Sequence, residues 1–219
     1  DLIQINLNGS AGQSLGAFLS KSISLKIFGD ANDYVAKGLS GGKIVVVPSK
    51  INRLKTKENT IIGNTVLYGA TSGKLFAAGK AGERFAVRNS GGTAIVEGCD
   101  SNGCEYMTGG NIIILGSIGD NFGAGMTGGM AFIHDPENTF ENYVNPASIT
   151  WQKPETKYWK EKLKSLIQEH LKETDSVIAK KILNDFENEI NNFKQVCPVE
   201  MLDKLENPIT LKDRISKAV

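Results

Sequence analysis

The sequence predicts a mainly β fold, a parallel β-helix of about six coils followed by an α-helical extension. The first observation is that all 24 glycines lie within residues 1–135 and none lies beyond them. The second is charge: 22 of the first 135 residues are charged, against 27 of the last 84. The third is a glycine repeat in the first part. Together they divide the chain into a Gly-rich β-helix at residues 1–147 and an α-helical extension at residues 148–219.

The repeat becomes visible when segments are aligned on a glycine that precedes a short apolar run. These reference glycines are separated by steps of 31, 19, 18 and 19 residues. The long step contains a polar, Lys-rich insert at Pro48–Thr60, which we expect to be a surface loop, and without it the period is near 19. An earlier, degenerate copy covers Leu19–Phe28. The five reference glycines are Gly42, Gly73, Gly92, Gly110 and Gly129.

A unit of this length is too short for a hairpin plus a helix, and it suits one coil of a solenoid in which each turn stacks on the last. Stacked strands lie about 4.8 Å apart, so six coils make a rod roughly 29 Å long. Glycine adopts positive φ without steric cost, so we assign the reference glycines to coil corners. The predicted rungs are Ile44–Val47, Leu75–Ala78, Ala94–Val96, Ile112–Leu115 and Ala131–Ile133.

A polar residue also recurs nine positions before each reference glycine. A column of this kind would suit a carboxylate ladder for catalysis or cation binding. Short polar side chains more often satisfy backbone groups in turns, and we favour that interpretation. This polar column comprises Asp33, Asn64, Glu83, Ser101 and Asp120.

The residues alone do not set the handedness of the coils. Ile62–Gly79 also divides into three hexads, the pattern of left-handed hexapeptide helices, many of which are acyltransferases. The hexads do not persist through the other copies, which argues against that alternative.

The extension has the periodicity of amphipathic helices. Apolar residues recur every three or four positions over Glu155–Leu171, and Pro154 stands at the start, where proline is tolerated. A second helix carries its apolar face from Ile178 to Phe193 and is expected to stop before Pro198, and a short helix is expected at Met201–Leu205. We interpret these faces as packing surfaces, with His170 as a packing residue whose polar groups are satisfied.

Several motifs suggest chemistry and lack the context it needs. Cys99 and Cys104 have the spacing that opens a plant-type ferredoxin site, but Met107 stands where the next Cys is required. Gly123–Gly128 matches G-x-G-x-x-G, but an apolar run follows it instead of a helix. His134 and His170 lie too far apart for a metal motif, and no nucleophile elbow supports a Ser-His-Asp triad around His134. We therefore predict no catalytic, cofactor-binding or metal-binding residues in this chain.

Composition limits the partners and the compartment. The chain has 25 basic and 24 acidic residues and a net charge of +1, which gives no electrostatic reason to expect nucleic acid or an anionic membrane surface. It has no apolar run of about 18 residues and no signal-peptide pattern at its start.

The three cysteines, with Cys197 as the third, are expected to be free thiols in a reducing compartment, the cytoplasm or the stroma of an organelle. Because the chain begins at Asp1 and not at Met, we expect it to be cut from something longer.

The Gly-rich part resembles the C-terminal domain of the large subunit of glutamate synthase. In the extension, Tyr143–Asn145, the Leu-Ile-x-x-His run that ends at His170, and the Thr-x-Ser run that ends at Ser176 are similar to the same family. One departure is Ser20–Ser22, which stands where a Gly-containing corner is expected. The segments that carry the resemblance are Gly12–Phe18, Gly29–Gly42, Gly63–Thr71, Ala78–Gly91, Gly103–Gly110 and Asn121–Gly129.

The resemblance implies a right-handed β-helix with an architectural role. Glutamate synthases make two glutamates from glutamine and 2-oxoglutarate: an amidotransferase domain releases ammonia, and a flavin domain receives it through a tunnel. The implied cofactors, FMN and an iron–sulfur cluster, would lie in the rest of the enzyme and none in this chain. The implied partners are the other domains or subunits of glutamate synthase.

Two alternatives remain open at this point. The Gly-rich part also resembles the β-helical subunit of formylmethanofuran dehydrogenase, which is a structural component of another redox complex, although the extension argues against it. A stand-alone acyltransferase or polysaccharide-active enzyme would need a reactive groove, for example one in which Asp33, Glu83 and Arg84 converge.

Overall fold

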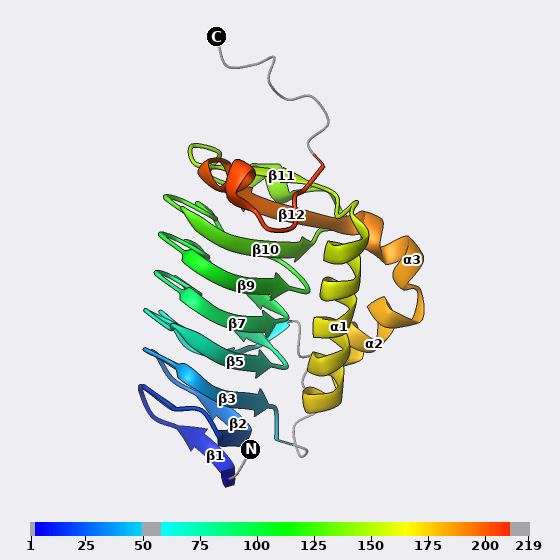
Figure 1. The fold of residues 1–219 in the computed structure, drawn as a ribbon. Coiled ribbons are helices and arrows are strands. Elements are labelled where there is room, and N and C mark those ends of the chain that lie inside the picture. Colours follow the sequence, from blue (N-terminus) through cyan, green and yellow to red (C-terminus); the bar gives the residue numbers. More distant parts are fainter. Residues whose placement is uncertain (1–2, 50–57, 211–219) are drawn as a thin grey trace.

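The computed structural model describes residues 3–49 and 58–210. Seven strands stack in parallel along one face, as Figure 1 shows, which confirms the predicted mainly β solenoid of about six coils. A short second face is formed by β4 (Thr60–Ile62), β6 (Lys80–Ala81) and β8 (Gly98–Cys99), which are also parallel. The stacked strands are β1 (Ile3–Ala11), β2 (Ile23–Ala31), β3 (Ser40–Val47), β5 (Ser72–Ala77), β7 (Ser90–Val96), β9 (Thr108–Ile114) and β10 (Gly128–His134).

Side chains of the stacked strands alternate between two apolar cores. One set faces the interior of the rod and includes Ile44 and Leu75. The alternate set, which includes Val45 and Phe76, faces outward and is covered by the helices of the extension. Because both faces of the strands are buried, the rungs appear in the sequence as continuous apolar runs and not as alternating ones.

The arcs that join the coils have an unexpected backbone. Positive φ angles occur eight, six and four positions before each reference glycine, for example at Tyr34, Ala36 and Gly38. The N–H groups of such residues donate to neighbouring coils, as Thr65 does to the carbonyl of Glu83 at 2.8 Å and Leu67 to the carbonyl of Val35 at 2.9 Å. These hydrogen bonds between stacked arcs offset the strain of left-handed backbone at residues that have a Cβ.

The reference glycines lie within the first residues of the strands, beside the arcs. At Gly110, φ is +92°, and a Cβ would come within 2.2 Å of the carbonyl oxygen of Gly92, so only glycine fits there. The assignment of all five glycines to coil corners stays a prediction. In the first coil, Ser22 takes φ +76°; because Ser24 pairs with Lys43, Ser22 corresponds to Gly41 of the next coil, which takes φ +118°, so a serine adopts the positive φ in the Ser20–Ser22 departure.

The insert predicted as a surface loop at Pro48–Thr60 falls largely on residues 50–57, which lie outside the described residues. Before the helices, η2 (Phe140–Asn142) and β11 (Ile149–Gln152) follow the last coil.

The first predicted helix is confirmed, and it lies along the rod. This helix, α1 (Lys157–Thr174), crosses the outer face of the strands in Figure 1. Trp159 contacts Phe132 of β10, with a ring separation of 6.0 Å, and His170 contacts Phe76 of β5, also at 6.0 Å. Eighteen residues of helix measure about 27 Å. The five strand spacings from β10 to β2 measure about 24 Å, so the helix matches the rod in length.

The second predicted helix is wrong in its last part. The chain forms α2 (Val177–Asn184), α3 (Phe186–Glu189) and η3 (Ile190–Asn192), and then β12 (Phe193–Pro198), which lies antiparallel between β10 and β11. Phe193 and Cys197 are both buried, and their spacing suits either a helix or a strand. The open edge of β10 selects the strand, because its backbone groups need partners. The short helix expected at Met201–Leu205 is the 3₁₀ helix η4 (Val199–Lys204).

The strands β11 and β12 extend the sheet of the rod, so the extension is joined to the β-helix by backbone hydrogen bonds as well as by side chains. The division of the chain at residue 147 stays a prediction.

Candidate functional site

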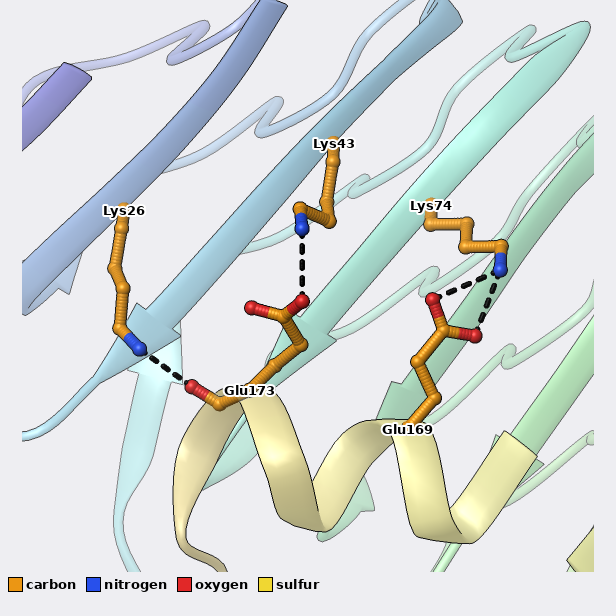
Figure 2. Close-up of polar contacts among 5 residues, drawn as sticks. All are labelled: Lys26, Lys43, Lys74, Glu169 and Glu173. Atoms are coloured by element: carbon orange, nitrogen blue, oxygen red, sulfur yellow. Dashed lines mark hydrogen bonds and ion pairs between the residues drawn. The ribbon is translucent and has the colours of Figure 1, made fainter. Parts of the chain in front are cut away.

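Charged contacts attach the C-terminal half of α1 to the rod, as Figure 2 shows. Lys43 Nζ donates to Glu173 Oε1 at 2.7 Å, and Lys74 Nζ donates to both carboxylate oxygens of Glu169 at 2.7 and 2.8 Å. Lys26 Nζ donates to the backbone carbonyl of Glu173 at 2.6 Å, at the end of the helix where a cation is favoured. We call these five residues the helix clamp.

The clamp sets position more than it supplies stability. The Lys74 and Glu169 side chains are 43% and 31% exposed, and ion pairs so accessible to water contribute about 0.5 kcal/mol. Burial of Leu163 and Ile167, both inaccessible to solvent, supplies far more, roughly 2 kcal/mol for each side chain. Apolar packing therefore holds the helix against the sheet, while the lysines of successive strands fix where along the rod it lies.

His170 lies in the apolar layer between α1 and the strands. It is a packing residue, as predicted, and it contacts Phe76. Neither ring nitrogen has a hydrogen-bond partner among the described residues, so the expectation that its polar groups are satisfied is wrong. Burial lowers the pKa of His170 to about 3, so the imidazole is neutral at physiological pH.

A cleft of about 870 Å³ lies between the end of β10, the following loop and α2. His134 Nε2 is 2.8 Å from Glu189 Oε2 at its wall. Burial by itself raises the pKa of Glu189, but the hydrogen bonds from His134 and Asn192 outweigh it, and the net pKa is lowered. The carboxylate of Asp135 accepts the N–H groups of Thr139 and Phe140 at 2.8 and 3.1 Å.

These contacts give two acidic residues of the cleft, Asp135 and Glu189, structural roles. Asp135 organises the loop after β10, and Glu189 holds His134 in place. Within the described residues, His134 has no hydrogen bond to a serine or cysteine, so the triad considered around it is not assembled.

Two members of the polar column, Asp33 and Asn64, accept backbone hydrogen bonds at the arcs. Asp33 Oδ1 accepts the N–H of Asn64 at 2.8 Å, and Asn64 Oδ1 accepts the N–H of Glu83 at 2.9 Å. Each of these two side chains thus satisfies a backbone N–H group of the next coil. Arg84 Nη2 lies 3.1 Å from the carboxylate of Glu105. Arg84, which the enzymatic alternative would place in a reactive groove with Asp33 and Glu83, is thus paired with Glu105, a residue outside the polar column.

The three cysteines are free thiols, as predicted, and the structure shows that all three are buried. Burial raises the pKa of Cys99 to about 12 and of Cys197 to about 11, and it raises the pKa of Cys104 well above its ordinary value. Across residues 3–49 and 58–210, no group of three or more His, Cys, Asp and Glu side chains could hold a metal ion. In the G-x-G-x-x-G stretch, Gly123 and Gly125 take positive φ in the last arc, and β10 follows.

Sequence reasoning did not find the helix clamp. A signal was present, because Lys43 and Lys74 recur at the same place in successive rungs and Glu169 and Glu173 lie one turn apart on a helix. What joins the two halves is the orientation of α1 on the rod, which only the structure supplies.

The fold and these contacts define a class: a parallel β-helix braced along its length by a helix. The family model for the GXGXG motif matches residues 1–199, and the chain belongs to that family. No helix in the described part of the chain is long and apolar enough to span a membrane.

The chain is similar to segments of much longer proteins. It is 61% identical to the large chain of an NADPH glutamate synthase from Azospirillum brasilense, over 98% of this chain and 14% of that protein. It is 46% identical to an NADH glutamate synthase from Schizosaccharomyces pombe, over 99% of this chain and 10% of that protein. It is 51% identical to a ferredoxin-dependent glutamate synthase from Pyropia yezoensis, over 90% of this chain and 13% of that protein.

Proposed function

We propose that this chain is a structural domain of glutamate synthase, with no catalytic residues of its own, that holds the ammonia-producing and ammonia-consuming domains in register. The observation that carries the proposal is the braced rod: one continuous stack of parallel strands, with α1 matched to its length and attached by the helix clamp. Its relatives are named glutamate synthases, and the chain spans 10–14% of their length in the examples above.

A rigid rod suits this role because ammonia transfer between two domains depends on position. An intermediate that passes from one site to another is lost to water when the two openings are out of line. A stacked sheet resists bending, since every rung is hydrogen-bonded to its neighbours along the whole rod. Close-packed cores on both faces of the strands transmit force without yielding.

The cofactors of the reaction are proposed to lie in other parts of the enzyme. The cysteines give no thiolate set for an iron–sulfur cluster, because Cys99 and Cys104 face the interior core while Cys197 lies in the core under the helices. Their raised pKa values disfavour the thiolate form that ligates iron.

The experiment uses a complete glutamate synthase that contains this segment. Three variants remove the most chemically capable side chains: His134→Gln, Glu83→Gln and Arg84→Met. Glutamine hydrolysis and flavin reduction are measured separately, together with the ratio of glutamate formed to glutamine consumed. We expect each variant to keep both partial activities within about threefold. A loss of a hundredfold or more in one activity, in a variant that remains folded, would assign catalysis to this domain.

A further inference from the structure

Within the described residues, one end of the rod is closed and the other is open. At the closed end, β12 pairs with β10, and Val196, Ile149 and Phe140 are buried in the interior core over the last coil. At the opposite end lies β1, the outermost strand in Figure 1, which among the described residues pairs with β2 alone. The interior core of the rod therefore ends at β1.

The inward side chains of β1 continue the interior core but are not covered. The pairing register places Ile5 beside Leu25 and Leu7 beside Ile27, two members of the interior core. Leu25 and Ile27 are 8% and 1% exposed, whereas Ile3, Ile5 and Leu7 are 52%, 41% and 40% exposed. Three apolar side chains on the interior side of β1 are thus exposed at the end of the rod.

The edge of β1 also lacks the features that protect natural edge strands. Such edges are short or bulged, or they carry charges or proline, because an open edge pairs readily with another strand. The strand Ile3–Ala11 has nine residues, none of them charged and none of them proline. Its pairing with β2 runs through all nine positions without a register shift. This edge therefore carries none of the protective features named above.

We propose that a β-strand from another part of the glutamate synthase polypeptide pairs with the free edge of β1 and covers Ile3, Ile5 and Leu7. The inference rests on the proposed function, because it takes the rest of that polypeptide as the partner. The relatives described above are seven to ten times longer than the region they share with this chain, so the polypeptide offers ample sequence for this strand. Apolar residues at every second position would face the rod interior.

The backbone of β1 identifies which amides report on the partner. The N–H of Ile3 donates to the carbonyl of Ser22 at 3.1 Å, toward β2. Successive residues of a strand direct their N–H groups to opposite sides, so those of Gln4, Asn6 and Asn8 point to the free edge. An added strand would engage these three amides, which water reaches otherwise.

The test is amide hydrogen exchange on a complete glutamate synthase that contains this segment. We expect the amides of Gln4, Asn6 and Asn8 to exchange at least a hundredfold more slowly than an unstructured peptide. Exchange near the unstructured rate would overturn the proposal. Protection that disappears when an oligomer dissociates on dilution would assign the edge to a second copy of the chain, which also overturns it.

A matched pair of variants tests the apolar cover. Ile5→Ser removes an inward side chain, and Gln4→Ser changes its neighbour on the opposite face of the strand. Only Ile5→Ser should raise exchange in β1, by tenfold or more, while α1 keeps its protection; equal effects from both would contradict an apolar cover. If Ile5→Ser does not fold, the exchange of Gln4, Asn6 and Asn8 in the unmodified enzyme still decides whether a strand pairs with β1. Amide exchange is measured independently of activity. If the scaffold proposal fails, the exchange data therefore still show whether a strand covers the edge of β1.

Discussion

His170 makes the stability of the fold depend on pH. Its pKa is lowered to about 3 by burial, whereas an unfolded chain has the ordinary value near 6.5. Between these values the unfolded state binds a proton that the folded state does not, so stability is lost as the pH falls below 6.5. From pH 7 to pH 5 the loss is about 2 kcal/mol. For a chain of this size that corresponds to a fall of roughly 4–8 °C in Tm.

The assay is urea unfolding of the purified chain at pH 7 and pH 5, compared with His170→Leu. The leucine variant fills the apolar site without a titrating group, so its loss of stability over this range should be about 2 kcal/mol smaller. The same loss of stability in His170→Leu and in the unmodified chain would refute the reasoning.

Three further predictions concern the packing of the coils, the attachment of α1 and the cap of α2. A double-mutant cycle with Lys74→Met and Glu169→Gln should give a coupling of about 0.5 kcal/mol that fades in 1 M salt; an undiminished coupling would show a more buried pair. Gly91→Ala should lower the free energy of unfolding by about 2 kcal/mol, because its Cβ would lie 2.1 Å from a backbone oxygen of the neighbouring coil. Gly12→Ala, with open space around its Cβ, should be nearly neutral, and similar losses at both would contradict the close approach of the coils at Gly91. Ser176→Ala should cost at least about 1 kcal/mol in urea unfolding, because the hydroxyl caps α2 and also donates to the buried carboxylate of Glu97; no loss would show that both contacts are dispensable.

Much of the rod could be predicted because each coil repeats the same local pattern. Short apolar runs such as Ile112–Leu115 are buried on both faces, so their position in the repeat was enough to place them on stacked strands. The first helix was equally clear, because its apolar residues all face one sheet. The period of apolar residues in the sequence matches the period of the structure in both cases, because the same packing contact recurs in every coil or helical turn.

The arcs and the last strand could not be predicted because contacts between distant residues decide them. Tyr34 and Arg84 belong to residue types that disfavour positive φ, and the hydrogen bonds that offset this strain come from other coils. Phe193 to Pro198 carries an apolar spacing that suits a helix, and the free edge of β10 makes it a strand. The clamp is similar: Lys43 and Glu173 are 130 residues apart, and only the docking of α1 brings them together.

The measurement that tests the scaffold most directly is reconstitution. A glutamate synthase that lacks the segment equivalent to this chain is mixed with the purified chain, and glutamate formation from glutamine and 2-oxoglutarate is followed together with ammonia released to solvent. A domain that acts by positioning should bind, raise glutamate formation and lower the ammonia lost per glutamine consumed. If the chain binds and neither quantity changes, or if it shows an activity of its own, the scaffold account is contradicted.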